Sequence, residues 1–311
     1  MNAPFRTLIR VLLATVLVLV VLPATHSAAA NRVSFGAWTP GSPFGGNLHA
    51  TNSLERSLQR RVAIVSWYQD WGVDGSHFRW NVKKAVRSIR HSHRRAMLTW
   101  EPTGADWQSY TYDNIANGAK DDYIRWWARK VGRLHSTLYV RLAHEMNGNW
   151  YPWGGSTGGN SARKFRAMWR HVVDVARGAG ATNIKWVWCP LTEDVPNTRG
   201  NHFERYYPGR SYVDVLSLDG YNWGAATPQF GGWRSFHKIF AKPYRRIKRL
   251  GPQPIWIAEV GSASDGGNKS KWVRKMWRTA SRWDRLKAIV WFNEDKARDW
   301  STASAASAFH R

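Results

Sequence analysis

Cysteine and acidic residues are scarce in this sequence of 311 residues. Cys189 is the only cysteine, so no disulfide can form within the chain, and its stability must come from packing. Aspartate and glutamate number 21 against 46 lysines and arginines, which leaves a net charge of +25 at pH 7. Such an excess is typical of proteins that bind nucleic acids or other polyanions. Because the cations are spread over many predicted helices, we predict a basic solvated surface that associates weakly with anionic cell-surface polymers and binds no specific nucleic acid.

Motifs for metals and nucleotides are missing as well. The 11 histidines show no paired ligand spacing such as His-Glu-x-x-His, so we predict no metal and no cofactor. No glycine-rich phosphate turn follows a predicted strand, because the Gly154-Gly155 and Gly158-Gly159 pairs lack the required spacing and helix start. This argues against an open, doubly wound sheet, the second fold that the pattern allows.

Long hydrophobic runs are confined to the N-terminus. Two arginines precede an apolar run over residues 11–22, and three alanines at 28–30 supply a small-x-small cleavage site. This pattern predicts a secretory signal peptide over residues 1–30, and the run is too short for an ordinary membrane span. We therefore expect a secreted, extracellular monomer with no membrane span after cleavage and one catalytic domain over residues 31–311.

The rest of the chain alternates short β-like runs with longer segments of helical spacing. The expected strands are 33–38, 62–67, 96–100, 138–144, 184–188, 213–218, 254–259 and 288–292. Clear amphipathic helices are expected at 122–134, at 162–177 after Ser161 as N-cap, and at 271–283. Eight strand and helix units without a break in composition predict a single α/β domain, a (β/α)8 TIM barrel.

Two glutamates stand where such a barrel carries its chemistry, at the C-terminal ends of strands. Glu145 ends the fourth expected run and Glu259 ends the seventh. A retaining glycosidase needs two carboxyl groups about 5 to 5.5 Å apart, one to protonate the leaving oxygen and one to attack the anomeric carbon. Both glutamates close apolar runs in which an unpaired charge would be costly, so we predict that they are catalytic. The rival carboxylates are Glu101, Glu193, Asp219 and Glu294.

The segment from Arg141 to Trp153, with the sequence RLAHEMNGNWYPW, resembles the acid/base signature of glycoside hydrolase family 26. The resemblance implies that Glu145 is the acid/base and that Glu259, in IWIAE, is the nucleophile of a retaining glycosidase. Members of that family are mostly endo-β-1,4-mannanases, and some act on mixed-linkage β-glucan or xylan. The resemblance therefore implies a β-linked polysaccharide substrate, mannan first and β-1,3-1,4-glucan second. A carbohydrate-binding barrel without turnover is a further alternative.

The neighbours of the two glutamates follow from the chemistry. An acid that keeps its proton near neutral pH should lie against apolar groups and beside a second carboxylate. Tyr221, two residues after Asp219 on the same strand face, is expected to donate a hydrogen bond to Glu259. Arg141 shares the inward face and either keeps the site carboxylates ionised or pairs structurally with Asp219 or Glu101. His144 is interpreted as a hydrogen-bonding residue that shapes the site.

Tryptophan is abundant, with 21 residues. Those at helical spacing, such as Trp127, are expected in the core. Those near strand ends are candidate sugar platforms, because a pyranose presents a flat C–H face to an aromatic ring. These candidates are Trp150, Trp153, Trp223 and Trp291, with Trp291 expected beneath the reacting sugar and Trp153 next to the leaving group. The candidates for distal subsites are Trp67, Trp71, Trp100 and Trp107.

Overall fold

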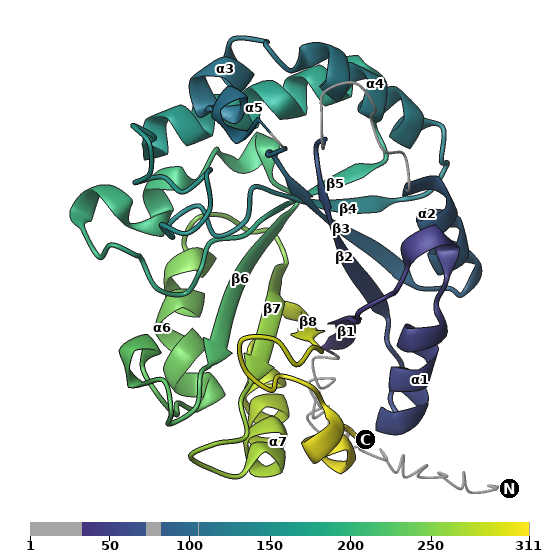
Figure 1. The fold of residues 1–311 in the computed structure, drawn as a ribbon, viewed down its shortest axis with the longest axis vertical. Coiled ribbons are helices and arrows are strands. Elements are labelled where there is room, and N and C mark those ends of the chain that lie inside the picture. The colour runs from purple at the N-terminus through teal and green to yellow at the C-terminus, as the bar shows by residue number, and fades with distance from the viewer. Residues whose placement is uncertain (1–32, 73–81, 105, 311) are drawn as a thin grey trace, which may run out of the picture. The chain divides into compact units, whose positions relative to one another are not determined.

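The computed structural model describes residues 33–72, 82–104 and 106–310. Eight parallel strands close into a barrel in sequence order, which confirms the predicted TIM barrel and rules out the open sheet (Figure 1). The strands are β1 (Ser34–Trp38), β2 (Ile64–Asp70), β3 (Arg95–Glu101), β4 (Leu138–Leu142), β5 (Ile184–Trp188), β6 (Val215–Asn222), β7 (Ile255–Ser262) and β8 (Leu286–Phe292). The predicted signal peptide lies outside the described residues.

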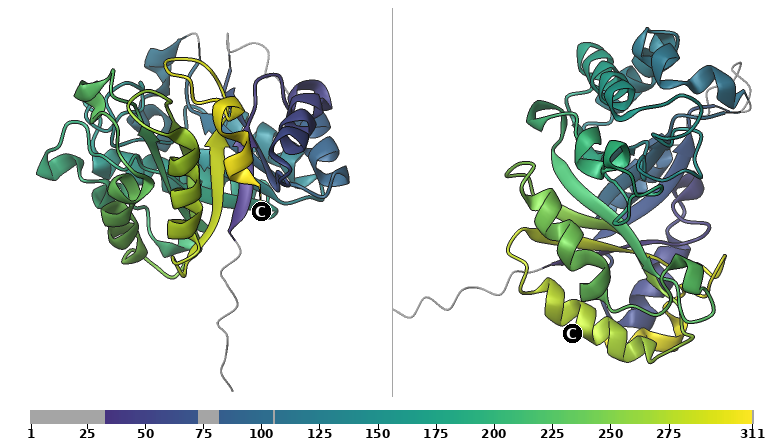
Figure 2. Two further views of the ribbon diagram at one scale, coloured as in Figure 1. Left: turned by 90° about the horizontal axis from the view of Figure 1, so that it is seen from below. Right: turned by 90° about the vertical axis from the view of Figure 1, so that its left-hand side faces the viewer.

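Helices surround the barrel on its outer side (Figure 2). They are α1 (His49–Leu58), α2 (Val82–His91), α3 (Tyr112–Ala116), α4 (Asp121–Gly132), α5 (Ala162–Gly178), α6 (Phe236–Lys248) and α7 (Lys269–Ala280). Short 3₁₀ segments are η1 (Phe44–Gly46), η2 (Trp107–Tyr110), η3 (Arg199–Asn201), η4 (Phe203–Tyr206), η5 (Arg210–Tyr212), η6 (Pro228–Phe230) and η7 (Ala303–Phe309). Within the described ranges, no helix is long and apolar enough to cross a membrane.

Side-chain caps explain where two of these helices begin. Ser161 accepts a hydrogen bond from the backbone N–H of Lys164, as expected for the N-cap of α5. Asn268 accepts one from the backbone N–H of Lys271, so α7 starts two residues before the predicted position. In both helices one face is apolar and buried against the barrel.

The barrel interior is filled below the mouth. Small and medium side chains from alternate strand positions form a separate buried cluster there, with Trp256 as its largest member. The ring of Trp256 lies 4.7 Å from that of Tyr139, between centroids, and closes this layer. The much larger core lies between the strands and the helices. Within the barrel, a ligand can therefore be held only above this plug, at the C-terminal ends of the strands.

Strand boundaries differ from prediction mainly at the mouth. β6 and β7 continue to Asn222 and Ser262, beyond the predicted ends, because polar residues there stay in register with neighbouring strands. β4 ends at Leu142, two residues early, because Ala143 and Glu145 adopt positive φ angles of 42° and 53°. The acid/base candidate therefore lies on a loop and not on the strand.

Candidate active site

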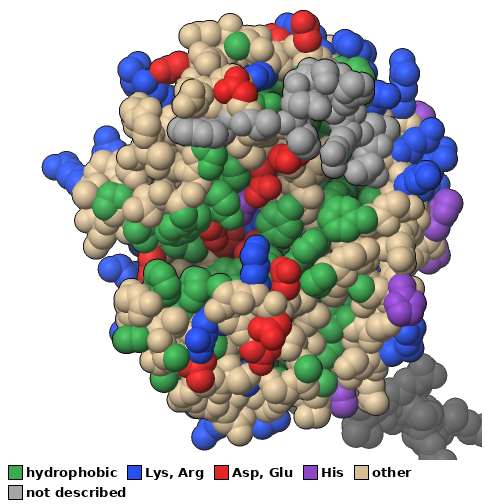
Figure 3. All heavy atoms as spheres, in the orientation of Figure 1, with side chains coloured by type: hydrophobic (Ala, Val, Ile, Leu, Met, Phe, Trp, Pro, Cys, Tyr) green, Lys and Arg blue, Asp and Glu red, His purple; other side chains and the backbone are tan. Residues whose placement is uncertain are grey.

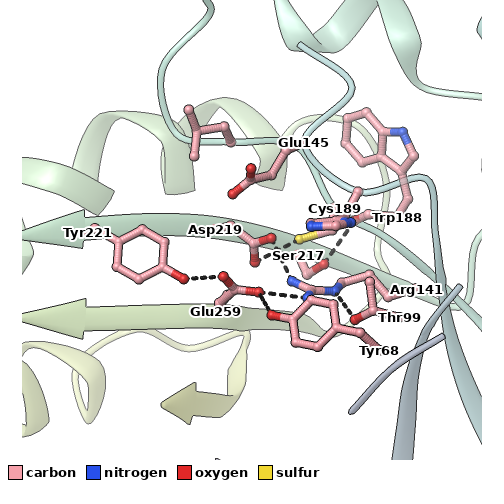
Figure 4. Close-up of polar contacts among 12 residues, drawn as sticks. Tyr68, Thr99, Arg141, Glu145, Trp188, Cys189, Ser217, Asp219, Tyr221 and Glu259 are labelled. Atoms are coloured by element: carbon pink, nitrogen blue, oxygen red, sulfur yellow. Dashed lines mark hydrogen bonds and ion pairs between the residues drawn. The ribbon is translucent and has the colours of Figure 1, made fainter. Parts of the chain in front are cut away.

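Glu259 lies in the barrel mouth and accepts hydrogen bonds from three side chains (Figure 4). The guanidinium of Arg141 donates to Oε2 at 2.7 Å, and the Tyr68 hydroxyl donates to the same oxygen. The Tyr221 hydroxyl donates to Oε1, which is the hydrogen bond expected from the sequence. The donors come from β4, β2 and β6. Three converging donors stabilise a negative charge on this carboxyl group.

An irregularity in β7 turns Glu259 inward. Ala258 packs inside the barrel, yet the next residue, Glu259, also reaches the mouth. Successive side chains of a regular strand point to opposite faces, so both could not face inward without a distortion. The pairing of β7 with β8 shifts register between Ile257 and Val260, which spans this position. Such a bulge re-aims a side chain, as bulges near active sites do.

Arg141 joins two buried carboxylates. Its side chain is fully buried, and its second ion pair is with Asp219 at 2.6 Å. Its Nε donates to Thr99 Oγ1 at 2.9 Å. The Cys189 thiol lies 3.0 Å from the other oxygen of Asp219 and donates to it. Arg141 therefore pairs with Asp219, one of the two structural partners expected for it, and also with Glu259.

Glu145 occupies a different environment at the same mouth. Its side chain points toward Asp219 and Glu259 in Figure 4, and its backbone N–H donates to the Cys189 carbonyl at 2.8 Å. Trp150 donates its indole N–H to Glu145 Oε2 at 2.9 Å. Burial, and after it repulsion from Glu259, raises the pKa of Glu145 to about 8. Glu145 therefore carries a proton at neutral pH, as a general acid must.

The loop after β4 is fixed by Asn147, which the sequence analysis did not single out. Its buried amide nitrogen donates to the carbonyls of Leu191 and Glu193 and to Asp194 Oδ1, at 3.0 to 3.1 Å. Its amide oxygen accepts from the Leu191 N–H at 2.8 Å. The next residue is Gly148, where a Cβ atom would lie 2.5 Å from the Trp150 ring. These two residues hold Glu145 and Trp150 in place.

His144 is a neutral, fully buried imidazole beside the site. Burial, and after it the charge of Arg141, lowers its pKa well below the usual value. Its Nε2 lies 3.1 Å from the Tyr151 hydroxyl, and its Nδ1 has no hydrogen-bond partner among the described residues. Ligand atoms of His144, Asp219 and Glu259 lie within 4.8 Å of one another. A metal does not fit there, because the Arg141 guanidinium already forms ion pairs with both carboxylates.

Two predicted sugar platforms are corrected by the structure. Trp291 is fully buried, donates its indole N–H to the Trp300 carbonyl and packs against α7 and η7. Because side chains alternate along β8, its neighbour Phe292 faces the mouth instead. Trp153 is also buried, stacks on Tyr151 and donates to the His144 carbonyl. It supports the site from behind and cannot contact a leaving group.

One of the predicted sugar platforms, Trp150, is exposed on the rim of the barrel mouth. Trp150 is 47% exposed and stands beside Glu145. Trp223 is half-buried and packs at a tilt against the exposed ring of Phe230. Of the distal candidates, Trp71 and Trp100 are buried in the core and are not subsites, whereas Trp67 is buried but lines the cavity beside Glu101. The side chain of Trp107 lies outside the described part of the structure. Trp38, which was not predicted, is half-buried and donates to Glu294 at 3.1 Å.

Glu101 adds a further carboxyl group to the mouth. It ends β3 opposite Asp70 of β2, and burial raises its pKa to about 7. A cavity of about 260 Å³ lies beside it, lined by Phe44, Tyr68 and Asp70 among others. Figure 3 shows the face hollowed at this level, with acidic side chains at the bottom and hydrophobic ones along the edges. The remaining rival, Glu193, pairs with Arg234.

Residues 66–261 match the model of glycosyl hydrolase family 26. The chain belongs to this family. Enzymes with this barrel fold carry their active sites at the C-terminal ends of the strands, which is where Glu145 and Glu259 lie in this chain.

Related proteins differ in how much of this chain they match. Endoglucanase H of Acetivibrio thermocellus is 35% identical over 279 residues, which is 89% of this chain and 29% of that protein. A mannan endo-1,4-beta-mannosidase of Bacillus subtilis is 31% identical over 94 residues, 27% of this chain and 23% of that protein. The chain spans less than a third of the length of either relative.

The fold of family 26 is also seen in solved structures. The catalytic domain of a family 26 endo-beta-1,4-mannanase from Bacillus sp. JAMB-750 superposes with a TM-score of 0.62 at 17% sequence identity. The match covers 86% of this chain and 78% of that domain. This likeness shows a common barrel.

Proposed function

We propose that the chain is a secreted, retaining endo-β-glycanase that hydrolyses β-1,4-linked mannan, with Glu145 as general acid/base and Glu259 as nucleophile. The observation that carries the proposal is the contrast between the two glutamates. Glu259 accepts three hydrogen bonds that stabilise a negative charge, whereas burial raises the pKa of Glu145 to about 8. One carboxylate and one carboxylic acid at neutral pH are the pair that a retaining glycosidase requires.

In the first step Glu259 attacks the anomeric carbon while Glu145 gives its proton to the glycosidic oxygen. The bond to the leaving sugar breaks, and a covalent ester forms between the remaining sugar and Glu259. Ester formation removes the charge of Glu259, which is the second cause of the raised pKa of Glu145. The pKa of Glu145 therefore falls at the moment when this residue must act as a base.

In the second step the Glu145 carboxylate takes a proton from a water molecule. The oxygen of that water attacks the anomeric carbon, the ester bond breaks, and Glu259 is released as a carboxylate. Two inversions give net retention of configuration. The carboxyl separation of about 5 to 5.5 Å stays a prediction, and a separation near 9 Å in a crystal structure would favour inversion.

Trp150 is the platform we assign to the leaving-group side. Its exposed ring lies next to Glu145, the residue that protonates the leaving oxygen. A sugar stacked on this ring would place its glycosidic oxygen near the proton donor. The hollowed face supports endo action, because a polysaccharide can lie across it on both sides of the reacting bond (Figure 3).

Mannan is supported by the relatives that carry this activity in their names, among them mannan endo-1,4-beta-mannosidases of Bacillus subtilis and Bifidobacterium adolescentis. A second candidate substrate, β-glucan, is favoured by Endoglucanase H, which matches 89% of the chain where these mannosidases match 27 to 36%. Most of Endoglucanase H lies outside the match, so its name does not decide between the two sugars.

The test is incubation of the protein with mannan, glucomannan, mixed-linkage glucan, xylan and curdlan. We expect internal cleavage of mannan, seen as a rapid fall in viscosity, and NMR of the first products should show the β-anomer. The control is Glu259→Gln, which keeps the shape of the side chain and should be inactive. Activity on mixed-linkage glucan alone would show that the substrate is β-glucan and not mannan. An α-anomer as first product would contradict the proposed retaining mechanism. Binding without turnover would indicate a carbohydrate-binding barrel.

Secretion is tested separately. The predicted signal peptide over residues 1–30 implies that the mature chain starts near Asn31. N-terminal sequencing of protein recovered from the medium should find this start. An intact N-terminus inside the cell would contradict the proposed location.

A further inference from the structure

A second hollow lies on the outside of the barrel, between the segment that follows β5 and helix α6. Its volume is about 600 Å³, within the range of about 300 to 1,000 Å³ that is usual for ligand sites. An adjoining hollow shares four of its residues, so the two form one continuous depression. We call it the basic groove and define it by Asn197, Arg199, Lys238, Lys242, Arg245 and Arg246.

The groove has cations without acidic partners. Arg199, Lys238, Lys242 and Arg245 are exposed, and none of their charged groups has an ion pair or hydrogen bond within the described ranges. The acidic groups of the groove are already engaged. Asp194 and Glu204 both pair with Arg246, at 3.3 and 2.6 Å, and Glu193 pairs with Arg234. The groove therefore presents an excess of positive charge to a ligand.

Three of these cations form a row along α6. Lys238, Lys242 and Arg245 stand four and three residues apart, which places them on one face of the helix with rises of about 6 and 4.5 Å. Steps of this size are comparable to the length of one sugar residue. The row matches a chain that carries one negative charge on every monosaccharide.

Among the residues that the structure describes, no aromatic side chain other than histidine lines the groove. Proteins that hold single-stranded nucleic acids add stacking platforms to their basic surface, and such platforms are missing from this lining. Arginine binds carboxylates through two parallel hydrogen bonds, and the exposed Asn197 offers an amide to sugar hydroxyls. The lining fits the carboxylates and hydroxyls of an acidic polysaccharide.

The floor of the groove is rigid before any ligand binds. Asp194 Oδ1 accepts hydrogen bonds from Asn147 and from the Phe203 N–H, and the Arg246 guanidinium lies 4.0 Å from the centroid of the Phe203 ring. Little ordering is then required on binding, which favours affinity. The same Asn147 holds the loop of Glu145, so the groove shares its support with the active site.

We propose that the basic groove binds a linear polyuronate chain and so anchors the enzyme to an acidic matrix that accompanies its neutral substrate. The groove lies outside the barrel mouth and takes no part in the chemical step.

The test compares two triple variants of equal charge. The first removes the row on α6, with Lys238→Ala, Lys242→Ala and Arg245→Ala. The second, the control, removes three exposed cations from α2, with Lys83→Ala, Lys84→Ala and Arg87→Ala. Binding to polygalacturonate is measured by calorimetry at low and at physiological salt, with double-stranded DNA and polyphosphate as competing polyanions.

We expect the α6 variant to lose about tenfold in affinity for polygalacturonate and the α2 variant less than about twofold. Both should keep the kcat of the wild type on a soluble neutral glycan, and circular dichroism should show the same fold. Equal losses in the two variants would assign binding to the overall charge and overturn the proposal. Tighter binding of DNA or polyphosphate, lost in the same variant, would keep the groove but reject polyuronate. These binding measurements need no turnover, so they do not depend on the proposed catalytic function.

Discussion

Two glutamates lie at the mouth of the barrel, one on the loop after β4 and one on β7, and the two chain segments hold them in different ways. Glu259 belongs to a continuous strand, and three side chains from three other strands hydrogen-bond to it. Glu145 lies on a loop, has a positive φ of 53°, and receives a side-chain hydrogen bond from Trp150. Among the described residues, the carboxyl group on the strand therefore has three side-chain hydrogen-bond donors, whereas the carboxyl group on the loop is buried with one.

The role of each glutamate follows from its surroundings. A carboxyl group with several donors is suited to remain an anion that attacks, and one that is desolvated is suited to keep a proton. The positive φ of Glu145, uncommon for a residue with a side chain, is held by the hydrogen bond to the Cys189 carbonyl and by Asn147 in the same loop. Substitutions of Glu145 and of Glu259 should therefore have different kinetic signatures.

The largest effect is expected for Glu259→Ala. Without the nucleophile no glycosyl ester can form, so kcat should fall on the order of 10⁴-fold or more. Added azide should restore activity by attack from the vacated side and give a product of inverted configuration. The measurement is the rate on an activated aryl glycoside with and without azide, and the product is identified by NMR. Recovery with retained configuration would assign the nucleophile to another residue.

Glu145→Ala should cost less, and the loss should depend on the leaving group. General acid catalysis contributes about 10²- to 10⁴-fold, so cleavage of polysaccharide should fall by that factor. An aryl glycoside with a good leaving group needs no proton, so its first step should be spared and appear as a burst of aglycone. Equal losses of activity on both substrates, without a burst, would contradict the assignment of Glu145 as the general acid.

Tyr68→Phe tests the donor set on the strand side. Loss of one hydrogen bond to a charged group costs about 1.5 to 3 kcal/mol, which corresponds to a fall in kcat/KM of roughly 10- to 100-fold. Tyr139→Phe is the matched control, because that ring packs on Trp256 deeper in the barrel and has no hydrogen bond to Glu259. If both variants lost activity equally, the effect would come from packing and not from the hydroxyl.

Trp150→Phe should change the rate least and the pH profile most clearly. The wild-type kcat/KM should fall as pH rises through about 8, because Glu145 then loses its proton. The indole N–H favours the ionised carboxylate, so its removal should raise the pKa of Glu145 and move this limb to higher pH. Trp223→Phe, which lacks a contact with Glu145, is the control and should leave the limb in place. A shift to lower pH would contradict the assigned role of the indole.

The regular parts of the barrel could be predicted from the sequence because their apolar residues alternate. The expected strands 33–38 and 184–188 agree with β1 and β5 within one residue. The two glutamates were found for the same reason, since a carboxyl group at the end of an apolar run stands out. Tyr221 was found from its strand face, and its hydrogen bond to Glu259 is present.

What could not be predicted depends on contacts between distant segments. Tyr68 lies one residue beyond the expected end of its strand, so its hydroxyl was not counted among the site residues. Asn147 acts on backbone groups 44 to 46 residues away, which no local pattern shows. Trp291 was expected beneath the reacting sugar, whereas strand alternation places its neighbour Phe292 at the mouth.

Arg141 has a consequence for the energy of the whole cycle. In the proposed mechanism its positive charge faces Asp219 and the attacking carboxylate of Glu259 before the first step, while Glu145 holds the proton that it will donate. When the ester forms as proposed, Glu259 becomes neutral and Glu145 becomes the anion, so the total charge of the buried group is conserved. Only the position of one negative charge changes, by the distance between two side chains. The buried side chains therefore create nearly the same electrostatic field in the barrel and at its basic surface before and after ester formation. Turnover then demands little reorganisation of the protein or of the ions around it.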